Sequence, residues 1–258
     1  MNVFMTFLMM IYIFPALAEE GKKQHSKGRI LDLKYNFKEA GREMPYSLYL
    51  PKACTDKKKW PLVVALHGLF SNPWQMIRYP GLTAQAEKYG FIVVAPMGYN
   101  SMGWYGSRGQ KSGLSLPKNL GELSEKDVLN VVANTQKEFP VDAHNIFLMG
   151  HSMGGGGTWH LGMKYPEKWA ALAPLAPAAP DNIADLKKIK DKPVIMVMGT
   201  SDFLWRSGLP WVAEMERLKM NYKYIEVKNG GHLLSVIQKV PEVFAFFEKH
   251  RRKPLEKP

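Results

Sequence analysis

The sequence predicts a single α/β domain built on a mostly parallel central sheet with helices on both faces. Short, wholly apolar runs recur along the chain, as expected for strands that are buried on both faces. Amphipathic stretches of helical length separate these runs, and strands that alternate with helices are joined by right-handed crossovers. The 258 residues contain neither an internal repeat nor a Pro/Ser-rich linker, which favours one domain over two.

The expected strands share an apolar run that ends at a proline, a glycine or a polar turn. They lie at 46–50, 61–66, 91–95, 145–149, 170–174, 194–198 and 222–227. The expected helices share a periodic apolar face, and they lie at 82–89, 124–139, 153–165, 209–220 and 240–250. Ser124 is the predicted cap of the second helix, because acidic residues follow it at the positive end of the helix dipole.

The amino-terminal segment has the pattern of a secretory signal. Residues 3–17 are almost wholly apolar and end in a small-x-small site at Ala18. The segment is shorter than the roughly 20 residues that a membrane span needs. No basic residue precedes Lys22, so an uncleaved anchor is the alternative. We expect a signal peptide over 1–18, a flexible lead-in over 19–29, and a secreted or periplasmic protein.

Composition describes an ordinary globular protein, with 46% hydrophobic and 22% charged residues, and excludes a disordered or collagen-like chain. The single cysteine, Cys54, is expected in a surface loop, and no Cys/His cluster has the spacing of a metal site. A net charge of +12 favours electrostatic contact with an anionic envelope polymer or polysaccharide. No nucleic-acid-binding motif accompanies the charge, and the most basic run leads into the tail at 251–258.

The residues Gly150 to Gly154 form a G-x-S-x-G pattern between a predicted strand and a predicted helix. This context places Ser152 on a strained turn above the carboxyl edge of the sheet. Small residues are needed on both sides, because a β-carbon there would collide with the neighbouring strand or helix. Four consecutive glycines, 154–157, begin the helix. No Gly-Lys-Ser/Thr follows them, so we interpret them as close packing of the helix rather than as a nucleotide loop.

A serine hydroxyl is a weak nucleophile unless a base, itself held by an acid, lies beside it. Asp202 follows the predicted strand 194–198, and His232 follows the strand 222–227. Each of the three residues thus lies beyond the carboxyl end of a strand, in the order Ser, Asp, His. The sequence therefore predicts that Ser152, Asp202 and His232 form a nucleophile, an acid and a base.

Other groups are expected around this site. The backbone N–H groups of Met153 and Leu69 are the predicted oxyanion donors, with Phe70 as the alternative to Leu69. We interpret His67, at the end of the strand 61–66, as structural. Trp104 and Tyr105 lie in a long loop that follows the strand 91–95, and they are candidates for substrate binding. The alternative is that they only cover the edge of the sheet.

Over residues 30–250 these motifs resemble the α/β-hydrolase superfamily. Within it, the chain looks like secreted feruloyl, acetyl-xylan and polyhydroxybutyrate-depolymerase esterases. The similarity rests on four runs of residues. They are Leu66-His67-Gly68, Gly150-His151-Ser152-Met153-Gly154-Gly155, Gly199-Thr200-Ser201-Asp202 and Gly230-Gly231-His232. The resemblance implies an α/β-hydrolase fold without a large cap.

It also implies a serine carboxylesterase that needs no cofactor and forms an acyl-enzyme on Ser152. The expected substrates are aromatic or short-acyl esters, either small molecules or groups on a polymer. A polyester depolymerase and a prolyl-oligopeptidase-like serine peptidase are the alternatives, since related motifs occur in both. A non-catalytic module that kept the fold is disfavoured by the intact set of three residues.

Overall fold

The computed structural model describes residues 26–109 and 117–252. They form one eight-stranded sheet in the order β1-β2-β4-β3-β5-β6-β7-β8. The strands are β1 Ile30–Phe37, β2 Arg42–Tyr49, β3 Trp60–Leu66, β4 Ile92–Pro96, β5 Val141–His151, β6 Leu172–Leu175, β7 Val194–Gly199 and β8 Tyr222–Val227. All neighbours from β4 to β8 pair in parallel, whereas β1 and β2 form an antiparallel hairpin at one edge. The predicted fold class is confirmed.

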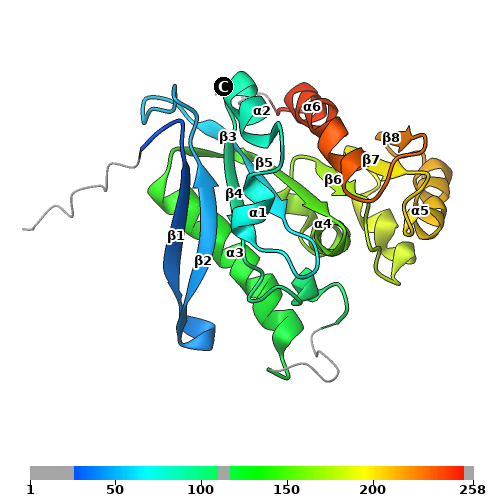
Figure 1. Cartoon of the computed structure of the whole chain (residues 1–258), viewed down its shortest axis with the longest axis horizontal. Helices are drawn as coiled ribbons and strands as arrows, with labels where there is room; N and C mark the ends of the chain where they lie inside the picture. The colour runs from blue at the N-terminus through cyan, green and yellow to red at the C-terminus, as the bar shows by residue number, and fades with distance from the viewer. Residues whose placement is uncertain (1–25, 110–116, 253–258) are drawn as a thin grey trace, which may run out of the picture.

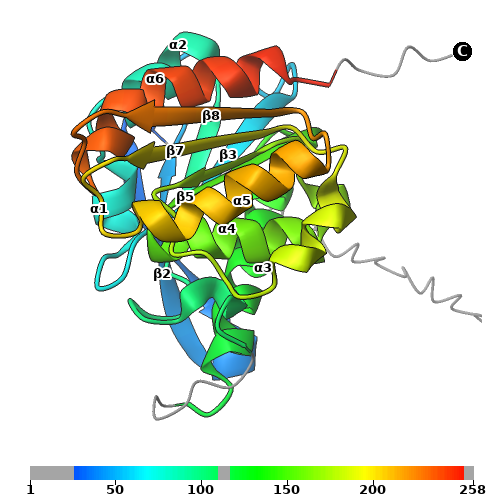
Figure 2. The same cartoon turned by 90° about the vertical axis from the view of Figure 1, so that its right-hand side faces the viewer.

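Helices cover both faces of the sheet. They are α1 Pro73–Ile77, α2 Leu82–Tyr89, α3 Leu120–Glu138, α4 Met153–Lys164, α5 Trp205–Arg217 and α6 Leu234–Lys249. In Figure 2, α2 and α6 lie above the sheet and α3, α4 and α5 lie below it. The two faces have separate cores: Val63 and Ala65 pack on the α1, α2 and α6 side, and Leu62 and Val64 on the other. Both faces of β3 are therefore buried, which explains its wholly apolar sequence.

Several predicted boundaries are wrong. The helix predicted from Ser124 begins at Leu120, so Ser124 is not its cap; it is fully buried and its hydroxyl accepts the N–H of Tyr105 at 3.0 Å. The helices predicted from residues 209 and 240 begin earlier, at Trp205 and Leu234. Pro210 and Pro241 lie near the two predicted starts, because a proline normally occupies the first turn of a helix. In this structure both prolines lie inside helices that begin earlier.

The hairpin β1–β2 is longer than the single strand predicted at 46–50. Cys54 is buried rather than on the surface, and burial raises the pKa of its thiol. The predicted signal peptide falls outside the described residues and stays a prediction. Within the described ranges, no helix is long and apolar enough to cross a membrane.

The two ends of the parallel strands have different surroundings. The carboxyl ends lead into the loops that carry the candidate residues, and Figure 1 shows β7 and β8 at the edge of the sheet opposite the β1–β2 hairpin. At the opposite end, near the start of β5, the Asn145 side chain donates to the carbonyl of Arg252 at 2.9 Å and accepts its N–H at 2.7 Å. The last described residues are thus held at the amino edge of the sheet.

Candidate active site

Ser152 lies in the turn between β5 and α4 with φ 58° and ψ −114°, a conformation that is strained for a residue with a side chain. Two close backbone approaches enforce the turn. A β-carbon on Gly150 would lie 2.2 Å from the carbonyl oxygen of Gly154, and one on Gly154 would lie 2.3 Å from that of Leu66. Both glycines of the motif are therefore required, as predicted from the sequence.

The three glycines after Gly154 let α4 approach its neighbours. A β-carbon would lie 2.7 Å from Pro177 at Gly155, 2.2 Å from the carbonyl oxygen of Ala178 at Gly156, and 2.6 Å from the Tyr105 ring at Gly157. The interpretation of this run as close helix packing is confirmed. It also brings the amino end of α4, with its free N–H groups, against the carboxyl edge of the sheet.

The structure brings Asp202 and His232 together. Nδ1 of His232 lies 2.8 Å from Oδ2 of Asp202, and the other carboxylate oxygen accepts the N–H of Leu204 at 2.9 Å. The Asp202 side chain is fully buried, whereas that of His232 is 24% exposed. Since a carboxylate only accepts, Nδ1 carries the proton, which leaves Nε2 as the basic nitrogen.

Ser152 does not complete this arrangement by a direct bond. The hydrogen bonds of the described residues do not include one from the Ser152 hydroxyl to His232. In ligand-free hydrolytic sites this contact is often long, and it shortens when substrate binds. The residue before Ser152, His151, does contact the base, since its ring centroid lies 4.7 Å from that of His232.

The loops that carry the acid and the base are tied to each other. The Ser201 N–H donates to the carbonyl of Gly230 at 3.0 Å, and the Asn229 N–H donates to the hydroxyl of Thr200 at 2.8 Å. A β-carbon on Gly199 would lie 2.1 Å from the carbonyl oxygen of Gly230. The glycines around Asp202 and His232 thus permit the close approach that their hydrogen bond requires.

Two aromatic rings flank the imidazole of His232, and sequence reasoning assigned neither of them. His151 lies on one side, and Phe203 lies at a centroid distance of 4.7 Å with its own ring 78% exposed. Phe203 directly follows Asp202, which is the only signal in the sequence that could have identified it. Burial, and then the charge of a protonated His232, lower the pKa of His151 to about 4, so it is neutral near pH 7.

The loop after β3 carries Leu69, the residue whose N–H is predicted to bind the oxyanion. A β-carbon on Gly68 would lie 3.5 Å from Cβ of Ser152, so this loop runs beside the candidate nucleophile. The N–H of Phe70 donates to the carbonyl of Ser101 at 2.9 Å, which removes it as a donor to substrate. Leu69 forms no such bond among the described residues, and Met153 is the first residue of α4. The two preferred N–H groups are thus available.

His67 has the structural role that was predicted. It is fully buried, and its ring nitrogens lie 2.8 Å from the carbonyl oxygens of Gly68 and Met97. Burial lowers the pKa of its imidazole, and the ring lies between the loops that follow β3 and β4.

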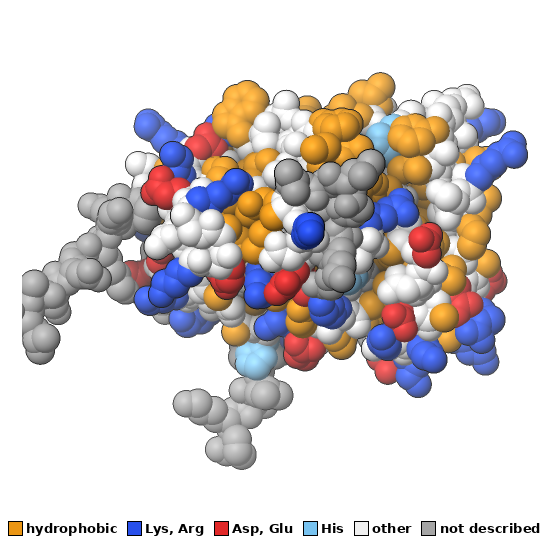
Figure 3. Space-filling model, turned by 90° about the horizontal axis from the view of Figure 1, so that it is seen from below, with side chains coloured by type: hydrophobic (Ala, Val, Ile, Leu, Met, Phe, Trp, Pro, Cys, Tyr) orange, Lys and Arg blue, Asp and Glu red, His pale blue; other side chains and the backbone are white. Residues whose placement is uncertain are grey.

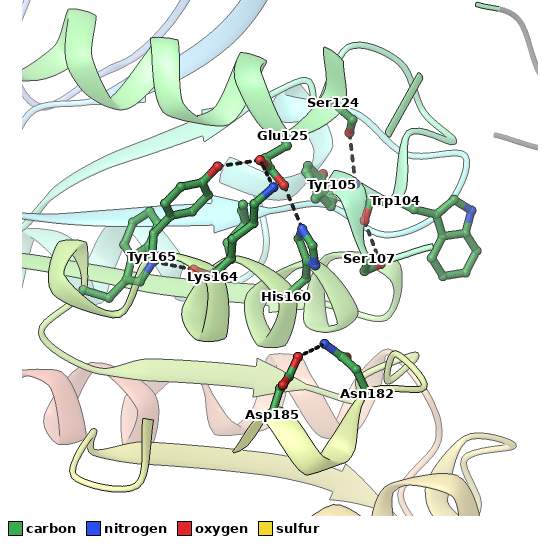
Figure 4. Close-up of polar contacts among 12 residues, drawn as sticks. Trp104, Tyr105, Ser107, Ser124, Glu125, His160, Lys164, Tyr165, Asn182 and Asp185 are labelled. Carbon is green, nitrogen blue, oxygen red and sulfur yellow. Dashed lines mark hydrogen bonds and ion pairs between the residues drawn. The ribbon is translucent and has the colours of Figure 1, made fainter. Parts of the chain in front are cut away.

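The two aromatic residues predicted to bind substrate differ in exposure. Tyr105 is fully buried, and its hydroxyl donates to the carbonyl of His67 at 3.2 Å, so it presents no free ring face. For Tyr105 the alternative, a covering role, therefore holds. Trp104 is partly exposed, and in Figure 4 its ring projects away from the other labelled residues. The Arg108 guanidinium lies 4.7 Å from its ring centroid.

Buried carboxylates on α3 hold the loop that carries Trp104. Asp127 accepts the N–H groups of Gly98 and Tyr99 at 2.6 and 3.3 Å, and its burial raises its pKa to about 6. Glu125 lies behind the loop and accepts three hydrogen bonds, as Figure 4 shows. Two of the donors are on α4, and the third directly follows it. These donors are His160 at 2.7 Å, Lys164 at 2.7 Å and Tyr165 at 2.5 Å. Burial alone would raise the pKa of Glu125, but the three donors outweigh it and lower the pKa to about 2.

Large apolar side chains are exposed in the loops and helix starts that follow the carboxyl ends of the strands. We call this set the apolar rim; it consists of Leu69, Phe70, Trp74, Met102, Phe203, Leu233 and Leu234. In Figure 3, orange side chains gather along the upper edge of the face, beside a pale-blue histidine. Solvent-exposed apolar groups of this size around a polar site are typical of a surface that binds an apolar ligand. Among the described residues, no group of three or more His, Cys, Asp or Glu could hold a metal ion.

Comparisons with known proteins identify the family. The family model named Esterase matches residues 38–235, which include Ser152, Asp202 and His232. The chain therefore belongs to the Esterase family, a family of carboxylic ester hydrolases with the α/β-hydrolase fold.

Among curated proteins, the chain is 34% identical to the human acylamino-acid-releasing enzyme over 162 residues, which are 61% of this chain and 21% of that protein. The chain thus spans about a fifth of the length of that relative. It is 28% identical to a bifunctional acetylxylan esterase/xylanase of Neocallimastix patriciarum over 63% of this chain and 22% of that protein.

Solved structures share the fold. The fluorophosphonate-binding serine hydrolase F of Staphylococcus aureus, in a substrate-bound structure, matches with a TM-score of 0.69 at 18% identity, over 86% of this chain and 99% of that one. A feruloyl esterase module from Clostridium thermocellum, complexed with sinapinate, matches with a TM-score of 0.68 at 16% identity, over 90% of this chain and 92% of that one.

Proposed function

We propose that the chain is a serine carboxylesterase that hydrolyses aromatic or short-acyl esters through an acyl-enzyme on Ser152. The hydrogen bond between Asp202 and His232 carries the proposal, because it fixes the tautomer in which Nε2 of His232 can accept a proton. The strained turn at Ser152 supports it as well, since such turns expose the nucleophile of α/β-hydrolases.

The proposed reaction has two steps. Nε2 of His232 takes the proton of the Ser152 hydroxyl while the Ser152 oxygen attacks the ester carbonyl. The N–H groups of Leu69 and Met153 stabilise the oxyanion that forms. The imidazolium gives the proton to the leaving alcohol as the acyl-enzyme forms. A water molecule, deprotonated by His232, then attacks the acyl-enzyme and releases the acid. Buried Asp202 stabilises the imidazolium in both steps, and no cofactor takes part.

The apolar rim supports the substrate class. Phe203 and Phe70 are 78% and 73% exposed, so they offer aromatic surface to an acyl group or an aryl ring. The names of the relatives are consistent with this class, since they include an acetylxylan esterase and a feruloyl esterase. The first name indicates an acetyl ester carried by a polymer, and the second indicates an ester of an aromatic acid. We propose the same two types of substrate for this chain.

A serine peptidase is the second candidate. The identity with the acylamino-acid-releasing enzyme, 34% over 162 residues, favours it. Peptide hydrolysis would use the same three residues, and only the leaving group would differ. Polyester hydrolysis is a variant of the first proposal, in which the alcohol is part of a polymer.

The test is a substrate panel measured on the full chain and on Ser152→Ala. The panel contains p-nitrophenyl esters of increasing acyl length, methyl ferulate, acetylated xylan, a polyester film and a blocked peptide anilide. We expect ester cleavage that falls by roughly three orders of magnitude or more in Ser152→Ala. Retention of more than a tenth of the activity by Ser152→Ala would contradict the mechanism, and faster cleavage of the anilide than of every ester would favour the peptidase.

We also propose that the protein is exported, on the basis of its apolar segment over residues 3–17. Amino-terminal sequencing of the protein made in a secreting bacterial host tests this proposal. A mature chain that starts near Glu19 is the expected result, and retention of Met1 in the cell interior would contradict it.

A further inference from the structure

A chain of hydrogen bonds that the proposed mechanism does not use links the nucleophile strand to the loop of the base. The Tyr79 hydroxyl lies 2.8 Å from Nδ1 of His151, and Nε2 of His151 lies 3.2 Å from the carbonyl oxygen of His232. His151 is the last residue of β5 and the direct neighbour of Ser152. The link therefore starts from the residue that precedes the candidate nucleophile and ends on the backbone of the candidate base.

The chemistry of the three groups fixes their roles. A carbonyl oxygen can only accept, so Nε2 of His151 donates to His232. In a neutral imidazole the other nitrogen must then accept, and the Tyr79 hydroxyl donates to it. Burial keeps His151 neutral at working pH, and it raises the pKa of Tyr79 to about 12, so neither group changes its charge near pH 7. The tautomer of His151 is thus set by the carbonyl of His232, and the Tyr79 hydroxyl completes it by donating to Nδ1.

The base loop is anchored at several points, and His151 supplies the anchor to β5. On one side it is tied to the acid loop, through Gly230 and Asn229. On the other side, the carbonyl of Gly231 accepts the hydroxyl and the N–H of Ser235 at 2.7 and 3.3 Å, which ties the loop to α6. The carbonyl of His232 is held to β5 by His151, and the two imidazole rings are in contact with centroids 4.7 Å apart and planes tilted by 42°. His151 therefore links the backbone of His232 directly to the strand that precedes Ser152.

We propose that Tyr79 and His151 are positioning residues: the Tyr79 hydroxyl orients the His151 imidazole, which holds His232 at the distance from Ser152 that proton transfer requires. This inference rests on the proposed function, because it gives His232 the role of base. The two residues act only through His232. Their loss should therefore lower kcat and leave KM unchanged, because substrate is bound by other groups.

Three single variants and one double variant of the full chain test the proposal with p-nitrophenyl acetate. His151→Leu removes both hydrogen bonds, and we expect kcat to fall about 10- to 100-fold with KM within twofold. Tyr79→Phe keeps the ring but leaves Nδ1 of His151 without a donor, and we expect a loss of about 3- to 10-fold. His151→Gln can both donate to His232 and accept from Tyr79, so it should stay within about threefold of the parent. In the double variant Tyr79→Phe/His151→Leu, the loss should equal that of His151→Leu alone.

A measurement without turnover separates this proposal from the proposed function. In the Ser152→Ala background, the proton on Nδ1 of His232 is observed by one-dimensional NMR in the far-downfield region. We expect one sharp resonance in Ser152→Ala and in its His151→Gln derivative, and a shifted or broadened one with His151→Leu. Thermal unfolding of each variant reports whether it is folded. If His151→Leu does not fold, the same measurements on Tyr79→Phe test the proposal.

The proposal is overturned if His151→Leu keeps kcat within twofold of the parent, or if His151→Gln loses as much as His151→Leu. An identical His232 resonance in all three proteins would also overturn it. Activity that persists in Ser152→Ala would instead refute the proposed function, whatever the His151 variants do.

Discussion

Asp202 and His232 are 30 residues apart in the sequence, yet Oδ2 of one lies 2.8 Å from Nδ1 of the other. The buried carboxylate meets the inner nitrogen of a ring that is 24% exposed on its other side. Two adjacent parallel strands, β7 and β8, deliver the two residues to the same edge of the sheet. Such a pair can orient and stabilise an imidazolium, and this is the physical basis of the proposed esterase activity.

Removal of the acid charge should impair the base without unfolding the protein. In Asp202→Asn we expect kcat for p-nitrophenyl acetate to fall by roughly 10³- to 10⁴-fold, because the amide no longer selects the correct tautomer of His232. Asp185→Asn, at a partly exposed carboxylate in the 3₁₀ helix Ile183–Ile189, is the matched control and should retain full activity. Comparable activity in Asp202→Asn and the control would be inconsistent with the assigned role.

Gly154→Ala should destabilise the fold. The new β-carbon would lie 2.3 Å from the carbonyl oxygen of Leu66, so helix α4 or strand β3 must move. We expect the free energy of unfolding, measured in urea, to fall by roughly 2–4 kcal/mol. Gly231→Ala is the control, since a β-carbon there meets nothing within 4 Å, and it should cost less than about 0.5 kcal/mol. Equal stability of the two variants would show that the close approach at Gly154 has no energetic cost.

The stability contributed by Glu125 should depend on pH. Its pKa is about 2 in the folded protein against 4.5 for a free carboxyl, so its contribution is fully present above pH 4.5 and is lost as the pH falls toward 2. At neutral pH, Glu125→Gln should lower the free energy of unfolding by roughly 2–3 kcal/mol. The difference from the parent should shrink by more than half near pH 3.

Urea unfolding at both pH values measures this difference. Glu122→Gln is the matched control, because Glu122 lies on the same helix but pairs with Lys126 on the surface. It should change stability by less than about 0.5 kcal/mol at either pH. If the difference in free energy of unfolding between the parent and Glu125→Gln stays constant with pH, the role of the three donors around that carboxylate is contradicted.

Phe203 should affect substrate binding rather than stability. Its ring is 78% exposed and lies against His232, so Phe203→Ala removes little buried surface from the folded protein. For p-nitrophenyl hexanoate we expect KM to rise about 3- to 10-fold, since part of the acyl chain loses its apolar contact. Phe203→Leu keeps an apolar side chain, so its KM should rise less than that of Phe203→Ala. If KM is the same in all three proteins, the apolar rim does not bind the acyl chain at this position.

The sequence contained enough to predict the parallel part of the fold. The run at 61–66 is wholly apolar because helices cover both faces of β3, and such a run differs from every amphipathic stretch around it. The edge strand Ile30–Phe37 was not predicted, because it alternates between apolar and polar residues and lacks the continuous apolar run that located the buried strands. The starts of α5 and α6 were misplaced because Pro210 and Pro241 lie inside helices that continue through them.

The candidate site divides in a similar way. Ser152, Asp202 and His232 could be proposed because each follows a strand in a recognisable local motif. Tyr79 could not, since its contact with His151 joins residues that are 72 positions apart and depends on how α1 packs over the sheet. The burial of Tyr105 was also unpredictable, because it results from the close approach of Gly157 on another element.

The hydrogen bonds between Asn145 and Arg252 have a practical consequence. They hold the end of the described chain at the amino edge of the sheet, and Figure 2 shows that α6 ends on the side opposite the arrowheads of β7 and β8. A carrier, a bead or a second protein joined beyond Arg252 would therefore lie behind the molecule. Immobilised in this way, the enzyme would face a solid ester with its reactive side unobstructed.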